Sequence, residues 1–500
     1  MTRPNVNIPF LLLLLAYFTL HVVLRVHLSG SLDYDEAEQT LFAQWLLPGY
    51  TEQPPLFTWI QHGLFQLFGH NALAVSIMKN ALLFFTYLFT YLSALRLLRN
   101  SHTAILATVS LLLIPQIGWE SQRDMTHTVL VVCAAAGTLL ATLRAVEKQN
   151  LFNALLLGLC ITAGCLGKAN YFLFLAILLL TLLSIKEGRK VIFNRFFPLA
   201  LLLPLLLCGE YFWWMYNNQD IVFSATRKFK LAEADYYLRG MISMVQAIAL
   251  FLFPFWLFYL LVFPTGIKPG NIDEPDVGQR FIARYIFIFL LLLLAVVLSF
   301  KVTYVKDRWL QPMLFCAPIW FFSRLTATQV TAKRFRVFLG IGILAMAGIY
   351  IAFTLRIVGA GWYGEDSKFS RMNYPFPAMA AALRAKGFDG GLILTNKRFL
   401  AGNMLLLFPH STALIPGYRF EKQLSEQQAT EYKKVLLVWM PSESPKIPEE
   451  LRRYAEKMGV DVKALHEEKI TRPWLYSSTP SQSVVLGTAL GKWTVRKQLQ

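Results

Sequence analysis

The side chains best suited to acid–base chemistry gather in one stretch, Ser29 to His62, which contains no Lys or Arg and lies between two strongly apolar segments. Its carboxylates are Asp33, Asp35, Glu36, Glu38 and Glu52. A carboxylate held at a membrane surface can act as a general base toward a hydroxyl or bind a cation, because neighbouring like charges and partial desolvation raise its affinity for a proton. The structural alternative is that Asp33 or Asp35 caps a helix and that Glu36 and Glu38 interact favourably with the dipole of this helix.

An apolar stripe and a proline turn follow these acidic residues. The stripe consists of Leu41, Phe42, Trp45 and Leu46. Its spacing is that of one face of an amphipathic helix, which we expect to lie along the membrane surface. Pro54 and Pro55 then turn the chain, and a proline pair suits the first turn of a second helix.

The composition identifies a polytopic membrane protein. The chain has 500 residues, of which 55% are hydrophobic and 16% charged, with a mean hydropathy of +0.46. A compact soluble core could not bury so much apolar surface. The net charge of +18 does not indicate nucleic acid binding, because the Lys and Arg residues fall mostly in short loops. The five cysteines lie in apolar segments without metal-ligand spacing and are assigned to packing.

Hydropathy predicts about eleven membrane spans. They cover residues 8–28, 72–98, 104–117, 126–143, 151–166, 171–185, 196–216, 244–263, 281–300, 310–322 and 338–355. Basic loops follow the even-numbered spans, which predicts that these loops and the amino terminus are cytoplasmic. The acidic first loop and, because the number of spans is odd, the carboxy-terminal region are then expected on the opposite face.

Several cations on that opposite face violate the positive-inside bias. They are Arg123, Lys168, Arg227, Lys228, Lys230, Lys306 and Arg308. Cations placed against the bias indicate a site for an anion such as a phosphate. The alternative is that they neutralise nearby carboxylates or lipid headgroups.

The fold class expected is mainly α, with a small carboxy-terminal α/β soluble domain. We predict a transmembrane domain over residues 1–358, with a first outer loop at 29–70, and an extracytoplasmic domain over 359–500. The predicted strands are Gly391 to Thr395, Thr412 to Pro416 and Val435 to Met440, with a helix at Pro448 to Gly459. No GxGxxG fingerprint follows these strands.

Short motifs in the outer loops carry a family resemblance. They are DEAEQ (35–39), QPPLFTW (53–59), Arg123-Asp124, Gly167-Lys168 and Arg308-Trp309. In these motifs the chain resembles the bacterial membrane glycosyltransferases of the GT-C fold. Within them it is similar to the protein-mannosyltransferase-like group, which includes the aminoarabinose transferases acting on lipid A and the rhizobial lipopolysaccharide galacturonosyltransferases.

The resemblance implies an inverting enzyme with a polyprenyl-phosphate sugar as donor and a lipopolysaccharide, lipid A or other envelope glycan as acceptor. Its implied catalytic residues are Asp35, Asp124 and Glu36, and its implied substrate-binding residues are Lys168, Arg308, Arg123 and Gln53. Glu52 matches a position that binds a divalent metal in the aminoarabinose transferases, so a metal is an open option and no other cofactor is implied. Those enzymes carry Lys where this chain has Gln53, which removes one phosphate contact.

The resemblance also implies a multi-pass protein of the bacterial inner membrane with a periplasmic active site. Two other functions stay open. Transfer to protein Ser or Thr, as in an O-mannosyltransferase, uses the same chemistry with another acceptor. A lipid or sugar transporter or flippase predicts ionisable residues near span midpoints and related halves, whereas the charges here concentrate in loops on one face.

Overall fold

The computed structural model describes residues 5–223, 236–267, 276–326, 328–359, 371–418, 420–424, 431–477 and 483–493. The chain forms two compact units. The first, here called the helical unit, comprises Met1–Thr19, Leu47–Phe57 and Lys79–Ile349. The second, the sheet unit, comprises Leu20–Leu46, Thr58–Met78 and Tyr350–Gln500. Parts of the predicted outer loop at residues 29–70 therefore fall in each unit.

Helices dominate the described chain. The α-helices are α1 (Ile8–Leu28), α2 (Tyr34–Phe42), α3 (Leu56–Phe68), α4 (Ala72–Leu98), α5 (Ser101–Val109), α6 (Pro115–Gly118), α7 (Glu120–Arg123), α8 (His127–Glu147), α9 (Leu151–Cys165), α10 (Tyr171–Ser184), α11 (Lys186–Ile192), α12 (Phe197–Leu207), α13 (Gly209–Asn217), α14 (Gln219–Phe223), α15 (Tyr236–Leu252), α16 (Phe255–Val262), α17 (Val277–Ser299), α18 (Gln311–Leu314), α19 (Ala317–Ser323), α20 (Ala332–Val358), α21 (Phe376–Ala385), α22 (Arg398–Leu407) and α24 (Glu449–Lys457). Short 3-10 turns are η1 (Ser110–Leu113), η3 (Pro264–Ile267), η4 (Asp307–Leu310), η6 (Arg371–Asn373), η7 (Phe420–Gln423) and η8 (Val462–Ala464).

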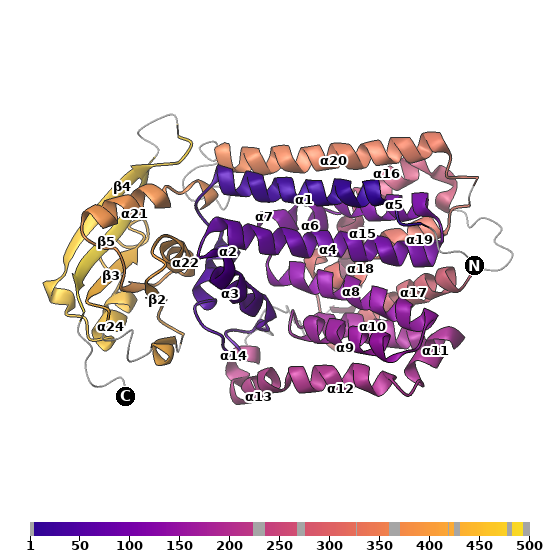
Figure 1. Cartoon of the computed structure of the whole chain (residues 1–500), viewed down its shortest axis with the longest axis horizontal. Helices are drawn as coiled ribbons and strands as arrows, with labels where there is room; N and C mark the ends of the chain where they lie inside the picture. Colours follow the sequence, from indigo (N-terminus) through magenta and orange to yellow (C-terminus); the bar gives the residue numbers. More distant parts are fainter. Residues whose placement is uncertain are drawn as a thin grey trace. The chain divides into compact units, whose positions relative to one another are not determined.

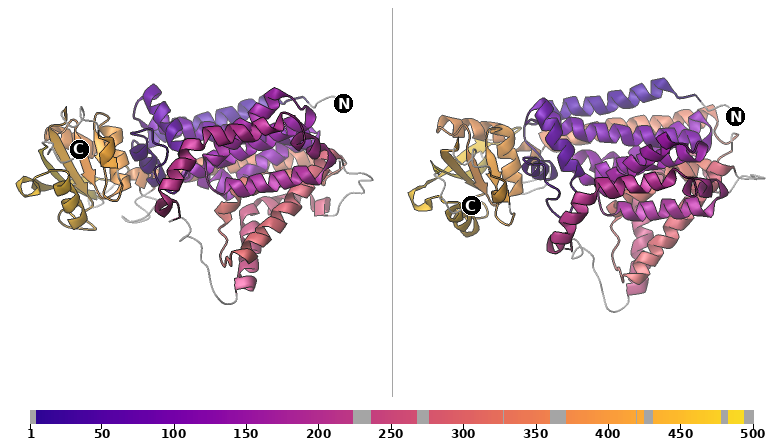
Figure 2. Two further views of the ribbon diagram at one scale, coloured as in Figure 1. Left: turned by 90° about the horizontal axis from the view of Figure 1, so that it is seen from below. Right: turned by 60° about the horizontal axis from the view of Figure 1, so that its bottom comes forward.

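The helical unit is built around α8, whose residues are almost all buried. Helices α8, α9 and α12 lie side by side in that order (Figure 1). A Cβ atom on Gly137 of α8 would lie 3.4 Å from Cys160 Sγ of α9, and the Thr138 hydroxyl lies 2.6 Å from the Tyr171 hydroxyl of α10. Helices α15 and α17 run side by side at a slant to the other helices of the unit (Figure 2).

Among the described residues, five helices are long and apolar enough to cross a membrane, namely α1, α4, α8, α17 and α20. The number rises to nine if each of four bent helix pairs counts as one span. The spans predicted at 196–216 and 244–263 fall on two such pairs, α12–α13 with a bend of 49° and α15–α16 with a bend of 64°. Pro254 separates the second pair, and proline supplies no N–H to a helix ladder. The count of eleven stays a prediction.

The sheet unit contains a five-stranded sheet. Its strands are β1 (Leu392–Thr395), β2 (Thr412–Leu414), β3 (Lys434–Trp439), β4 (His466–Pro473) and β5 (Ser483–Lys492), in the order β2-β1-β3-β5-β4. The pairs β1–β2 and β1–β3 are parallel, with Leu392 opposite Thr412 and Val435, whereas β5 pairs antiparallel with β3 and β4. The three predicted strands and the helix α24 are confirmed, and β4 and β5 were not predicted.

Helix α2 packs on α22 within the sheet unit. A Cβ atom on Gly402 of α22 would lie 2.0 Å from the carbonyl oxygen of Ala37, so the two backbones touch where only glycine fits. Leu41 and Phe42 are buried, and the Phe42 ring centroid lies 5.6 Å from that of Tyr418. The expectation that this stripe lies along the membrane surface is wrong for these two residues, because their apolar face is covered by the chain itself.

Helix α3 begins directly after the proline pair, at Leu56, as predicted. It is joined to α2 by two polar contacts. The Thr58 hydroxyl donates to Gln39 Oε1 at 2.6 Å, and His62 Nδ1 lies 2.7 Å from the carbonyl oxygen of Ala43. These contacts fix the two short helices of the first outer loop to each other.

Candidate active site

Asp33 is the N-cap of α2, which confirms the structural alternative for this residue. It forms a capping box in which its side chain accepts from the backbone of Glu36 while Glu36 Oε2 accepts from the Asp33 N–H at 3.1 Å. Asp35 lies between the two residues of the box, in the first helical turn, and its side chain is partly exposed.

Arginines from distant parts of the chain meet the carboxylates beside Asp35. Asp33 pairs with Arg356, Glu36 with Arg25 and Glu38 with Arg398. The sequence places no Lys or Arg in this stretch, so the like-charge repulsion expected there is offset by partners that only the fold supplies. Glu36 is 4% exposed, and its catalytic role stays a prediction.

In the helical unit, the loop of Lys168 meets the loop of Arg308. Lys168 Nζ donates to the Thr128 hydroxyl at 2.6 Å, at the start of α8. Asn170 Nδ2 donates to the carbonyl oxygen of Trp309 at 3.0 Å. Arg308 itself is exposed, and its backbone N–H donates to Asp307 Oδ1 at 2.8 Å. The loops that carry two of the predicted phosphate-binding cations, Lys168 and Arg308, are therefore in contact.

The segment of Arg123 and Asp124 joins the same loops. Arg123 forms an ion pair with Glu120 at 2.6 Å, and Asp124 ends α7 with its N–H bonded to the Glu120 carbonyl. Gln116 Nε2 donates to Asp307 Oδ2. The α6–α7 region is thereby tied to η4, which carries Arg308.

The segment of Glu52 and Gln53 reaches this region through the residues after the proline pair. The Leu56 N–H donates to the Leu166 carbonyl at 3.1 Å, two residues before Lys168. The Phe57 ring centroid lies 5.5 Å from that of His127 at the start of α8. The helical unit thus gathers the segments of Glu52, Asp124, Lys168 and Arg308, whereas Asp35 and Glu36 belong to the sheet unit.

Buried polar side chains of α4 were missed in the sequence. Lys79 and Asn80 are each 4% exposed, and Gln122 Nε2 donates to Asn80 Oδ1 at 2.9 Å. An ionisable residue inside a predicted span is a functional candidate by itself. Lys79 interrupts an otherwise apolar stretch, and that signal was available in the sequence.

The described part of the chain holds no group of three or more His, Cys, Asp or Glu side chains placed to bind a metal ion. Metal binding at Glu52 stays a prediction from the resemblance, and no chemical step below uses a metal.

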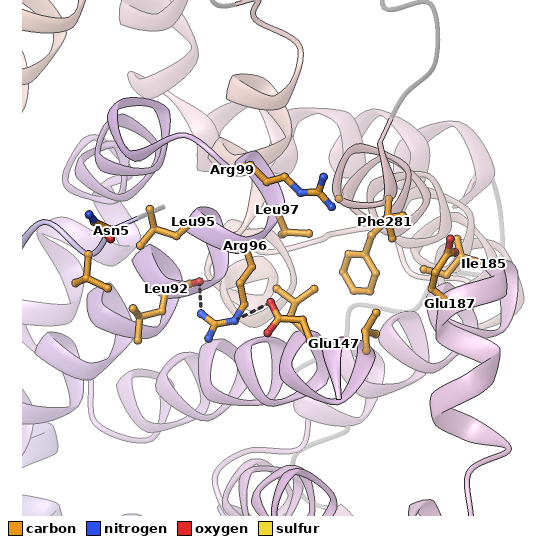
Figure 3. A pocket seen from close by; sticks show the side chains of 15 residues that line it. Asn5, Leu92, Leu95, Arg96, Leu97, Arg99, Glu147, Ile185, Glu187 and Phe281 are labelled. Carbon is orange, nitrogen blue, oxygen red and sulfur yellow. Dashed lines mark hydrogen bonds and ion pairs between the residues drawn. The ribbon is translucent and has the colours of Figure 1, made fainter. Parts of the chain in front are cut away.

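A cavity of about 640 Å³ opens elsewhere in the helical unit (Figure 3). Apolar side chains such as Leu92 and Phe281 line it together with Arg96 and Glu147, which form an ion pair at 3.4 Å. Its residues belong to helix ends that the positive-inside bias assigns to the cytoplasm. None of the predicted site residues lines this cavity, so we do not assign it to catalysis.

Comparisons with known proteins give the family. A family model described as dolichyl-phosphate-mannose-protein mannosyltransferase matches residues 52–214. Two relatives from Rhizobium johnstonii match most of the chain. The lipopolysaccharide core galacturonosyltransferase RgtB is 34% identical over 86% of this chain and 86% of its own length. The lipopolysaccharide core galacturonosyltransferase RgtA is 30% identical over 81% of this chain and 82% of its own length.

Solved structures agree on the fold. The crystal structure of ArnT from Cupriavidus metallidurans bound to undecaprenyl phosphate has a TM-score of 0.57 at 11% identity, covering 96% of this chain and 98% of that one. The apo structure of the same protein gives the same TM-score at 12% identity over 95% and 97%. Since relatives at 30% and 34% identity match most of its length, the chain belongs to the GT-C family of membrane glycosyltransferases that includes these galacturonosyltransferases.

Proposed function

We propose that this enzyme transfers a galacturonosyl residue from a polyprenyl-phosphate donor to the lipopolysaccharide core, at the periplasmic face of the bacterial inner membrane. The sugar and the acceptor are those that the names of the two relatives print. The observation that carries the proposal is the meeting of the Lys168 and Arg308 loops in the helical unit, joined by the contact from Asn170 to Trp309. Cations on touching loops suit a phosphate leaving group.

The chemistry assigns one role to each side chain. Asp35 takes the proton from an acceptor hydroxyl as its oxygen attacks the anomeric carbon of the donor with inversion. The bond from that carbon to the phosphate oxygen breaks, and the polyprenyl phosphate leaves with the electron pair. Lys168 and Arg308 stabilise the negative charge that grows on this phosphate. Asp124 and Arg123 orient the acceptor.

A genetic test separates this function from its alternatives. Strains without the gene are complemented with the native gene, with Asp35→Asn or with Asp220→Asn, and their lipopolysaccharide is examined by mass spectrometry. Asp220 is an exposed carboxylate of α14 and serves as the matched control. We expect one uronic acid residue to be missing in the deletion and in Asp35→Asn, and to be present with Asp220→Asn. Full modification by Asp35→Asn would exclude Asp35 as the base.

The acceptor can be read from the same strains. An unchanged lipopolysaccharide together with a lost protein glycan would move the acceptor to protein, in line with the description of the matching family model. Uptake of labelled donor into vesicles without transfer would instead support a transporter.

The leaving-group role has its own measurement. With purified enzyme, Lys168→Met is expected to lower kcat by about 10²- to 10³-fold, because it removes one charged donor at the departing phosphate. Lys301→Met, which removes an exposed cation from the loop after α17, is the control. Equal losses in the two variants would contradict a specific role for Lys168.

A further inference from the structure

The first turn of α2 is held by arginines from three other segments of the sheet unit. Arg356 Nη2 pairs with Asp33 Oδ2, and Arg371 Nη1 lies 3.7 Å from Asp33 Oδ1. Arg25 Nη2 pairs with Glu36 Oε2 at 2.9 Å. Arg25 comes from α1, Arg356 from α20 and Arg371 from η6, so the two capping-box residues are reached from outside their own helix.

Burial separates these contacts from ordinary surface ion pairs. The side chains of Arg25 and Glu36 are 5% and 4% exposed, and those of Arg356 and Asp33 are 5% and 0% exposed. Losing one partner of such a pair leaves a charge without compensation in a place that water does not reach. The geometry of the pair is therefore strongly specified.

Arg25 also fixes the chain that leads into α2. Its Nη1 donates to the Ser29 carbonyl and its Nη2 to the Ser31 carbonyl, each at 2.6 Å. The Leu32 N–H donates to Asn403 Oδ1 of α22 at 2.8 Å. Hydrogen bonds at Ser29, Ser31 and Leu32 thus fix the backbone that leads into α2.

A nine-residue helix needs such support, because an isolated helix of this length is marginal in water. Glu36 and Ala37 are on the buried face of α2, whereas Asp35 is on its partly exposed side. Fixing Asp33 and Glu36 fixes the rotation of the helix about its axis, and with it the direction in which Asp35 projects.

We propose that Arg25 and Arg356 are positioning residues for the transfer reaction, which hold the first turn of α2 so that Asp35 keeps its catalytic orientation. The inference rests on the proposed role of Asp35. Arg356 and Arg371 come from the carboxy-terminal part of the chain, so this part would help to hold the first turn of α2, which carries Asp35.

The experiment uses the full-length enzyme and a nitroxide label on Asp35→Cys. Four of the five native cysteines are buried, and the chain labelled without Asp35→Cys gives the background. We expect an immobile label in the parent chain, a mobile label with Arg356→Gln and no change with Arg398→Gln. Arg398 pairs with Glu38 at a more exposed place, 37% and 18%, and is the matched control.

Kinetics supply the second readout, in the chain that retains Asp35. Arg356→Gln is expected to lower kcat by about 10²-fold with little change in the KM for lipopolysaccharide, as a small misplacement of a catalytic group does. Where Arg356→Gln does not fold, Arg371→Gln replaces it, because Arg371 is 25% exposed and contacts the same carboxylate.

The outcomes are distinct. A label that stays immobile, or a label that becomes mobile while kcat is unchanged, overturns the positioning role. Full transfer by Asp35→Asn overturns the proposed function instead, whatever the label reports.

Discussion

Ion pairs at two places in the molecule use the same residue types in different surroundings. At the first turn of α2, the pairs Arg25–Glu36 and Arg356–Asp33 have side chains no more than 5% exposed. At the helix ends near the cavity of Figure 3, Arg96 and Glu147 are 18% and 33% exposed, and Arg280 and Glu187 are 46% and 33% exposed. Buried pairs require one geometry, whereas exposed pairs tolerate many.

This difference teaches which arginines determine the structure of the candidate site. A hydrated ion pair exchanges readily with water and salt, so it cannot specify the direction of a neighbouring side chain. A buried pair whose arginine also donates to backbone carbonyls, as Arg25 does to those of Ser29 and Ser31, admits little rearrangement. The acidic loop is therefore an ordered structure, with an order imposed from distant segments.

The largest expected effect comes from breaking one buried pair. Arg356→Gln should lower the free energy of unfolding by about 3 kcal/mol, because the buried Asp33 carboxylate then keeps only its longer contact with Arg371. The measurement is thermal unfolding of the purified protein in detergent. The double variant Asp33→Asn with Arg356→Gln should lose less than the single variant, since the only charge that loses its partner is then that of Arg371, which is 25% exposed. Equal losses in the single and double variants would mean that the pair is not a compensated charge pair.

A steric change at the same helix should have an intermediate effect. Gly402→Ala places a Cβ atom 2.0 Å from the Ala37 carbonyl oxygen, so α2 and α22 must separate, at a cost of about 1–3 kcal/mol. The control is Gly63→Ala in α3, where a Cβ meets nothing within 4 Å. This control should be neutral or stabilise by up to about 1 kcal/mol. Unfolding midpoints of both variants test the prediction, and a neutral Gly402→Ala would contradict the close packing.

Local sequence patterns were enough to predict most helices and strands around the candidate site and in the sheet. The Asp33 cap depends on residues three positions apart, and the start of α3 depends on the proline pair before it. The apolar runs predicted α1 and α4 with their observed bounds, and short β-like runs predicted β1 to β3. Strand β4 was missed because HEEKITRP is polar and only Ile470 in it is buried, so it has no apolar alternation to detect.

Partners far apart in the sequence were beyond such patterns. Asp33 and Arg356 are 323 residues apart, and nothing local to either residue indicates the other. The same holds for Leu41 and Phe42, whose apolar face is equally suited to lipid and to the aromatic residues that cover it. Short motifs were enough to predict the candidate site residues, whereas the ion pairs that hold these residues could be identified only in the folded structure.

The smallest expected effect lies in the exposed pairs. Arg280→Gln removes the contact from Arg280 to Glu187, 3.4 Å long and open to water, and should change the free energy of unfolding by no more than about 1 kcal/mol. Since salt screens exposed charges, the difference between this variant and the native chain should shrink further in 1 M salt, where the Debye length is about 3 Å. Sugar transfer should be unchanged, because the positive-inside bias assigns Arg280 to the cytoplasmic face, opposite the predicted site. Thermal unfolding at low and high salt, with the transfer assay beside it, checks both statements.

A loss of stability in Arg280→Gln as large as that in Arg356→Gln would show that burial is not what distinguishes the two sets of ion pairs. The positioning role argued for Arg25 and Arg356 would then lose its physical basis.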